Sequence, residues 1–203
     1  MKKFLLVCLT VLMTTGLVQQ VNAQNISGGF KVDANMSNFL LTDLPAQKST
    51  MKVGANLGGF MKIDLHENFA IQPEMNFYFR QSKMETGPLE DDFQQWGMQI
   101  PIYAVGQMKM GDGLGYIGIG PYVGLGFDAR YNDADLDLYK EVGNATPMNR
   151  WDFGAGLMLG YEFNNGVQIN ANYQIGFIDQ LDALKDDATM LTQTVSLGIG
   201  YRF

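Results

Sequence analysis

The sequence predicts an all-β protein, a closed eight-stranded antiparallel up-and-down β-barrel that crosses a membrane with its strands. Eight segments alternate apolar with polar or small residues, which is the period of a strand whose two faces meet different surroundings. The links between these segments are alternately short and long. Glycine makes up 24 of the 203 residues, well above its usual share, and glycine eases the tight curvature of a narrow barrel.

The first 23 residues have the parts of a secretory signal peptide. Two lysines precede an apolar stretch over residues 4–18, and a small-residue cleavage pattern follows at 21–23. The apolar stretch is too short for a stable spanning helix. We expect cleavage of residues 1–23, which leaves residues 24–203 as one outer-membrane barrel domain. The lone cysteine, Cys8, lies inside the removed part, so we expect neither a lipoprotein nor a disulfide in the mature chain.

The first four segments alternate with little interruption. Residues 26–40 are apolar at the even positions from 30 to 36 and polar at the odd ones. Residues 51–65 are apolar at most odd positions, with lysine, glycine or asparagine between them. In residues 69–81 every odd position from 69 to 79 is apolar. Residues 96–110 are apolar at most even positions. Each segment has the roughly 9–11 residues that a tilted strand needs to cross a bilayer.

The last four segments carry more glycine on the polar face. Residues 116–127 are apolar at most odd positions and glycine at most even ones. Residues 151–163 repeat this pattern, and residues 167–177 set apolar positions against glutamine and asparagine. In residues 191–203 the odd positions from 195 onward read Val, Leu, Ile, Tyr and Phe up to the chain end. We expect this segment to pair with residues 26–40, because closure removes both sheet edges.

A soluble β-sandwich or lipocalin would show the same alternation, with its apolar face turned inward. The polar faces here are rich in glycine and asparagine with scattered charge, which suits a solvated exterior poorly. The expected short turns lie near residues 64–68, 111–115 and 164–166, and the expected long acidic links span residues 41–50, 82–95, 128–150 and 178–190. This alternation is typical of outer-membrane barrels and predicts a cell outer-membrane location with both termini periplasmic.

Aromatic residues gather toward both ends of the expected strands, as in the girdles that anchor a barrel at the two membrane interfaces. The long-loop group is Phe77, Phe79, Trp96, Phe127, Trp151, Phe153 and Phe177. The short-turn group is Phe69, Tyr161, Phe163, Tyr201 and Phe203. The terminal Tyr201 and Phe203 resemble the signature that the barrel assembly machinery reads in Gram-negative bacteria, and we expect them to act as the assembly signal.

Short motifs carry a resemblance to one family. Residues 72–81 read Gln-Pro-Glu-Met-Asn-Phe-Tyr-Phe-Arg-Gln, and residues 100–103 read Ile-Pro-Ile-Tyr. Together with the polar positions of residues 31–38 and the ending at residues 201–203, they resemble the PorT-like outer-membrane β-barrel family over the whole mature chain. Asn172 stands where that family often carries an arginine, so one cation of the lumen pattern is missing. The resemblance implies a small barrel and leaves open an accessory role in protein secretion.

The inward positions of the expected barrel carry charge of both signs. The candidate lumen charge network consists of Lys31, Asp33, Lys52, Lys62, Glu74, Arg80, Lys109, Asp152, Glu162 and Arg202. Unpaired buried charge is costly, and an eight-stranded barrel is just wide enough for side chains to fill. We therefore expect a salt-bridged plug, in which Glu74 and Arg80 pair with inward charges on the neighbouring segments 51–65 and 96–110, such as Lys62 and Lys109. The alternative is a small cavity for a ligand or an ion.

Catalysis has little support in the sequence. The sole histidine, His66, lies in an expected short turn, and nucleophilic triads or transition-metal sites need more than one such group. Residues 133–137 have calcium-like spacing, but Leu138 stands where an EF-hand loop needs glycine, so a solvated acidic loop is the simpler interpretation. We expect no enzyme, no cofactor and no metal. A formal net charge of −7 also disfavours nucleic acid.

Two classes of function remain open at this point. The first is a membrane anchor whose outer loops bind an unknown protein, a surface glycan or a divalent cation, or which simply supports the envelope. Its other partners would be outer-membrane lipid and the assembly machinery. The second is a narrow pore or a barrel that carries a small ligand. The residues themselves name no ligand.

Overall fold

The computed structural model describes residues 26–42, 47–86, 89–131, 137–139, 148–180 and 189–203. Its strands are β1 (Ile26–Thr42), β2 (Gln47–His66), β3 (Phe69–Thr86), β4 (Leu89–Met110), β5 (Gly113–Tyr131), β6 (Trp151–Glu162), β7 (Val167–Gly176) and β8 (Thr189–Arg202). Among these described residues, no helix is long and apolar enough to cross a membrane. The expected signal peptide lies outside the described residues.

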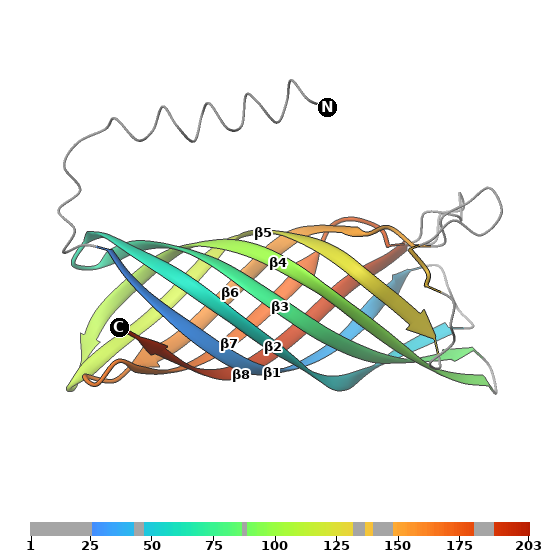
Figure 1. Cartoon of the computed structure of the whole chain (residues 1–203), viewed down its shortest axis with the longest axis horizontal. Helices are drawn as coiled ribbons and strands as arrows, with labels where there is room; N and C mark the ends of the chain where they lie inside the picture. Colours follow the sequence, from blue (N-terminus) through green and yellow to red (C-terminus); the bar gives the residue numbers. More distant parts are fainter. Residues whose placement is uncertain (1–25, 43–46, 87–88, 132–136, 140–147, 181–188) are drawn as a thin grey trace, which may run out of the picture.

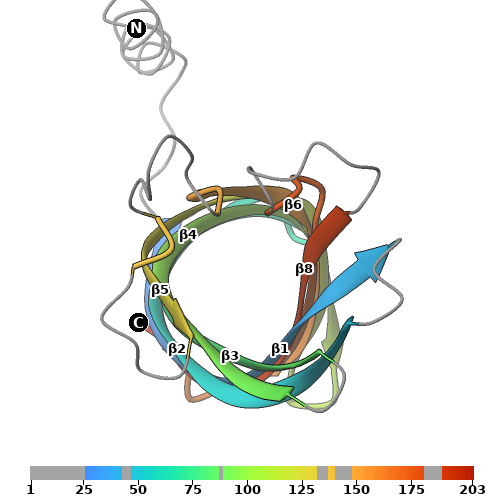
Figure 2. The same cartoon turned by 90° about the vertical axis from the view of Figure 1, so that its right-hand side faces the viewer.

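Each strand is antiparallel to its neighbour, and β8 pairs with β1 to close the ring (Figures 1 and 2). The closing ladder runs from the pair Gly29 and Arg202 to the pair Thr42 and Thr189. The predicted fold class, a closed eight-stranded antiparallel up-and-down barrel, is confirmed. Closure leaves no strand with an unpaired edge along the ladder, which removes a common route to aggregation.

The short turns gather at one end of the barrel, which also holds the C-terminus and the start of β1 (Figure 1). They join β2 to β3, β4 to β5 and β6 to β7, where the alternation of the links predicted them. Gly111 and Gly166 lie in these turns with φ of 59° and 84°, a backbone conformation that glycine adopts without steric cost. We call this the short-turn end, and the opposite end the long-loop end.

The strands β2 to β5 extend further toward the long-loop end than the sequence suggested. The ladder between β3 and β4 continues to the pair Thr86 and Leu89, so the link expected over residues 82–95 is wrong for most of its length. Ser82 and Met84 keep the inward, buried positions, while Lys83 faces outward. The alternation therefore persists, but its outer face is polar there, and the apolar outer face was the signal for a strand.

The two faces of the barrel are inverted relative to a soluble protein. Leu197 and Ile199 are 65% and 64% exposed on the outside, whereas Lys31 and Lys62 are only 4% and 2% exposed inside. The outer belt of exposed apolar side chains includes Phe77, which was expected to point outward and does. Such a surface matches a hydrocarbon environment, with polar groups collected in the lumen.

Candidate functional site

Among the described residues, three ion pairs of the barrel interior join different strands. Lys31 Nζ of β1 lies 2.6 Å from Glu74 Oε2 of β3. Arg80 of β3 lies 3.4 Å from Asp152 of β6. Arg202 of β8 pairs with Glu162 of β6. All three contacts link strands that are not neighbours in the backbone ladder.

The Glu74 carboxylate is the best-satisfied group of the interior. Besides Lys31 it accepts hydrogen bonds from Gln72 Nε2 at 2.9 Å and from Asn76 Nδ2 at 3.0 Å. Both amides lie two residues from Glu74 on the same strand, so the period of the strand places all three side chains on one face. Lys31 also lies 3.9 Å from Asp33. With no exposed surface on its side chain, Glu74 depends on these partners for its charge.

Arg80 crosses the lumen, because β4 and β5 separate its strand from β6 in the ring. Its guanidinium donates to Gln99 Oε1 at 2.6 Å and to Asp152 Oδ2 at 3.4 Å. The same Asp152 oxygen accepts from the Tyr122 hydroxyl at 3.1 Å. The Arg80 Cζ atom also lies 4.1 Å from the ring centroid of Tyr78, within the range of a cation–π contact. We call Arg80, Gln99, Asp152 and Tyr122 the crossbar, because their contacts span the interior.

A third group of polar side chains lies toward the short-turn end. Gln168 Nε2 donates to Glu162 Oε2 at 2.7 Å, and Arg202 donates to the other oxygen of that carboxylate. Lys62 lies near this pair with its Nζ 5.9 Å from the Tyr116 ring centroid. Within the part of the chain that the structure describes, no carboxylate lies within ion-pair distance of Lys62.

Two other residues of the candidate lumen charge network, Lys52 and Lys109, lie away from these clusters. Lys52 pairs with Asp92 at 2.7 Å, and both side chains are over a third exposed toward the long-loop end. Lys109 is exposed near the short-turn end. The expected pairing of Glu74 and Arg80 with Lys62 and Lys109 is therefore wrong. Glu74 is opposite Phe60 in the β2–β3 ladder, so Lys62 lies further along β2 toward the short turns.

Inward tyrosines packed against glycines are a feature that the sequence reading missed. A methyl group added at Gly154 would lie 2.6 Å from the Tyr122 ring, and one at Gly156 would lie 2.8 Å from the Tyr103 hydroxyl. Further such pairs are Tyr78 with Gly97, Tyr116 with Gly160 and Tyr139 with Gly126. The alternation placed tyrosines on the polar face, but the sequence analysis related the glycines only to the curvature of the barrel. In the structure these inward glycines leave the space that the tyrosine rings occupy.

An apolar cluster lies inside the barrel at the long-loop end. Strand residues Phe39, Met84, Phe93, Ala129 and Met190 pack there with Tyr139 and Met148 of the link between β5 and β6. The Tyr139 hydroxyl accepts from Gln95 Nε2 at 2.5 Å, and its burial raises the pKa of that phenol. We call this group the outer cap. The sequence reading treated the whole link as solvated acidic chain and missed it.

The outer cap also accounts for one residue of the calcium-like segment. Asp137 is the only residue of that segment among the described ones, and its carboxylate accepts hydrogen bonds from the backbone N–H groups of Tyr139 at 3.1 Å and Ala129 at 3.4 Å. These bonds fix the turn that carries Leu138 and Tyr139 toward the mouth of the barrel. Among the described residues, no cluster of three or more His, Cys, Asp or Glu side chains could hold a metal ion.

Comparisons with known proteins agree with this architecture. The sequence matches the family of the outer membrane protein beta-barrel domain over residues 9–203. No curated protein matches the chain. Among solved structures, it is similar to the outer membrane protein OprG from Pseudomonas aeruginosa, with 17% identity, 88% of this chain and 94% of that chain covered, and a TM-score of 0.53.

Two further barrels resemble the chain more weakly. Neisserial surface protein A has 13% identity, with 87% of this chain and 97% of that chain covered and a TM-score of 0.49. The outer membrane enzyme PagL has 11% identity, with 83% and 98% covered and a TM-score of 0.39. Identities this low show nothing about activity.

Proposed function

The chain belongs to the outer membrane protein beta-barrel domain family, and from this we propose that it is a closed outer-membrane anchor that acts through its extracellular loops. An outer-membrane barrel sits in the lipid bilayer with its apolar face outward. The finer elements of the proposal are a lumen closed to ions, a binding role of the loops, and the absence of catalysis.

The single observation that carries the closed lumen is the crossbar of Arg80, Gln99, Asp152 and Tyr122. It spans the interior between strands that are not neighbours. The outer cap lies above it toward the long-loop end, and the Glu74 cluster supplies a second polar layer. An eight-stranded barrel has just enough interior for such side chains to fill it, so these layers together support a plug.

The proposal extends to biogenesis and topology. Residues 1–23 would be removed as a signal peptide, and the barrel assembly machinery would read Tyr201 and Phe203. Phe203 N donates to the Gly28 carbonyl at 3.0 Å, so the chain end lies against the start of β1 at the short-turn end. Short turns on the periplasmic side are the rule in bacterial barrels, which supports periplasmic termini. The motif at residues 72–81 supports placing the chain among PorT-like barrels.

Conductance in a planar lipid bilayer tests the plug. We expect the purified, folded protein to show no steady ion current. Replacing Arg80 and Asp152 together with serine removes the crossbar and should produce measurable current, because water then fills the space of the lost side chains. The matched control is Lys52→Ser, which removes a cation of the half-exposed pair at the long-loop end. Steady current through the parent protein would contradict the closed lumen.

The loop-binding role needs a separate experiment. The protein with residues 181–188 replaced by a glycine–serine linker should lose a partner that the parent recovers from native outer membrane. A protein with Asn164 and Asn165 of a short turn replaced should keep it. Equal recovery by all three would count against a role of that loop.

A narrow pore or a ligand-carrying barrel is the second candidate, and one observation favours it. Several buried inward oxygens have no hydrogen-bond partner among the described protein atoms, including Asp33 Oδ1, Asp152 Oδ1 and Asn172 Oδ1. Buried polar groups of this kind are usually satisfied by something, and water or a small polar ligand in the lumen would do so. The conductance measurement separates this candidate from the plug. An accessory role in secretion stays an alternative that rests on the PorT-like resemblance.

A further inference from the structure

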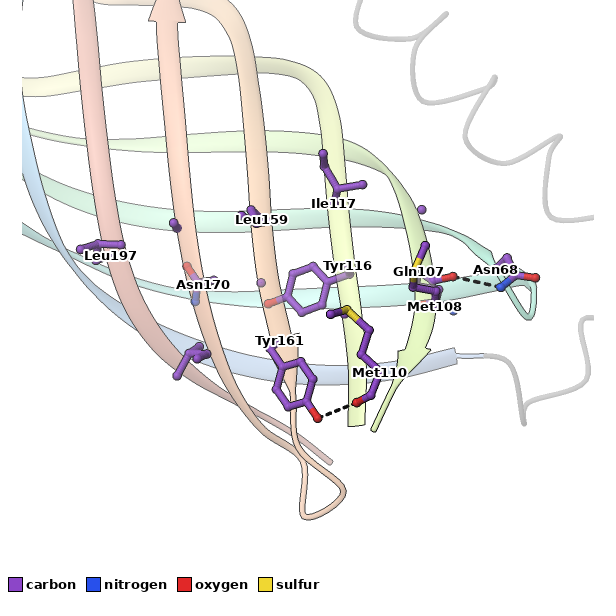
Figure 3. Close-up of a pocket in the computed structure, with 15 residues that line it drawn as sticks. Asn68, Gln107, Met108, Met110, Tyr116, Ile117, Leu159, Tyr161, Asn170 and Leu197 are labelled. Atoms are coloured by element: carbon purple, nitrogen blue, oxygen red, sulfur yellow. Dashed lines mark hydrogen bonds between the residues drawn. The ribbon is translucent and has the colours of Figure 1, made fainter. Parts of the chain in front are cut away.

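The lipid-facing wall is hollowed near the short-turn end. A groove of about 890 Å³ runs across β4, β5, β6, β7 and β8 and reaches Asn68 in the turn between β2 and β3 (Figure 3). It lies among outward side chains such as Ile117 and Leu159, which are 60% and 61% exposed. The exposed side chains of its lining belong to the lipid-facing side of the wall, and the lining also includes Tyr116 and Asn170, whose side chains are buried on the lumen side.

The groove exists because small residues occupy outward positions in the middle of a wall of large ones. Gly106 is opposite Ile117 in the β4–β5 ladder, and Ala171 is opposite Leu159 in the β6–β7 ladder. A methyl group added at Gly106 would meet no atom closer than 3.9 Å. Space of side-chain size is therefore open above Gly106, and the neighbouring large residues form the walls.

The chemistry of the lining is apolar. Of the described residues that border the groove, none carries a charge. The Tyr161 hydroxyl donates to the Met110 carbonyl at 2.8 Å, and Asn68 Nδ2 donates to the Gln107 carbonyl at 3.1 Å (Figure 3). Both donors are therefore already used in hydrogen bonds within the protein. The groove thus offers dispersion contacts and flexible thioether side chains from Met108 and Met110, which adapt to an apolar chain.

We propose that this groove binds an acyl chain of a phospholipid in the leaflet at the short-turn end. The groove is continuous with the surface that an outer-membrane barrel presents to lipid, so acyl chains reach it without any opening of the wall. In a bilayer, association depends on packing rather than on removal from water. A chain seated above Gly106 lies between the outward side chains of Phe69 and Ile117, the ladder partners of Gly106 on β3 and β5, whereas a chain on a convex part of the wall has protein on one side.

This inference rests on the proposed topology only for the identity of the leaflet, which would be the periplasmic one. The lipid would act as a fixed part of the wall and would hold β4 to β8 together at that end. The groove itself is defined by the barrel, which does not depend on whether the lumen conducts.

Filling the groove tests the proposal. Gly106→Leu places a side chain in the open space, and Gly59→Leu is the matched control. Gly59 also faces outward, on β2, where an added methyl group would lie 3.5 Å from the nearest atom, outside the groove. Both variants should fold, which heat-modifiable gel mobility checks. Native mass spectrometry in detergent with added phosphatidylethanolamine then measures binding.

We expect Gly106→Leu to weaken binding of one phosphatidylethanolamine by about tenfold, equivalent to about 1.4 kcal/mol, and Gly59→Leu to bind as the parent does. Phosphatidylethanolamine with a diazirine in its acyl chain, in vesicles, should label peptides that contain Met108, Ile117 and Leu159 above other lipid-facing peptides. Unchanged binding by Gly106→Leu, or even labelling around the barrel, overturns the proposal. A dimer that Gly106→Leu disrupts, with lipid binding unchanged, would assign the groove to a second copy instead. Neither readout measures conductance or orientation, so a failure here is distinct from a failure of the proposed function.

Discussion

Replacing Glu74 with leucine would leave the Lys31 ammonium in the barrel interior without its carboxylate. The parent carboxylate makes three polar contacts, with Lys31 at 2.6 Å, Gln72 at 2.9 Å and Asn76 at 3.0 Å. Removing one partner of a buried ion pair costs about 3–5 kcal/mol when the other charge is left uncompensated, and Lys31 would keep only its longer contact of 3.9 Å with Asp33. Each of the two amides also loses an acceptor, and an unsatisfied buried donor costs about 1–3 kcal/mol. We therefore expect a loss of at least about 3 kcal/mol.

Urea unfolding of the barrel in lipid vesicles, followed by heat-modifiable gel mobility, measures this loss. The double variant Lys31→Met with Glu74→Leu removes both charges and should recover a large part of it, since an apolar pair needs no partner. The coupling between the two sites follows from the complete cycle with Lys31→Met alone. Parent-like stability of Glu74→Leu would refute the reasoning, and so would a double variant no more stable than that single one. Either result would mean that Asp33 or water in the lumen compensates the charge of Lys31.

Three further outcomes follow from the same structure. A methyl group at Gly160 would overlap the Tyr116 ring and lie 2.7 Å from the Ile169 carbonyl oxygen, so Gly160→Ala should lower the free energy of unfolding by about 1–3 kcal/mol in the same assay. The control Gly106→Ala should leave that free energy unchanged, and equal stability of the two variants would contradict the packing of tyrosine rings on glycines. Tyr139→Ala should destabilise the outer cap by about 3–5 kcal/mol, as for other large buried aromatics, and should speed amide exchange at the long-loop ends of the strands; unchanged exchange there would argue against the cap. Deleting Phe203 should leave a processed protein unassembled in the periplasm, as shown by cell fractionation, and normal amounts of inserted protein would exclude a role in assembly.

The alternation of residue types determined the strands and their faces. Which side of a strand a residue occupies depends only on its own position along that strand. For that reason the outward Leu197 and the inward Lys31 could both be assigned without any knowledge of their neighbours. The short turns were equally accessible, because the interruption of the pattern and the glycines at 111 and 166 are local signals. The number of strands and the closure followed from counting these elements.

The contacts between inward side chains could not be predicted from the alternation of residue types. The contact of Glu74 with Lys31, rather than with Lys62, depends on the height of each residue along the barrel axis. That height is set by strand tilt and by ladder register, including the irregularities between Lys52 and Ala55 and between Trp96 and Gly97. One extra residue in a bulge shifts every later pair. The sequence shows which face of its strand a residue occupies, but it does not show the height of that residue along the barrel axis.

Contacts across the lumen and at its mouth depend even more strongly on the tertiary structure than the pairing of inward side chains does. Arg80 reaches Asp152 only because the ring closes and brings β3 opposite β6. Tyr139 enters the mouth of the barrel because Asp137 fixes its turn and because strand residues such as Phe93 present an apolar floor. The sequence by itself thus determined which residues face inward, since that is a property of a single strand. Only the tertiary structure decided which of them meet, since that requires the curvature of the whole sheet.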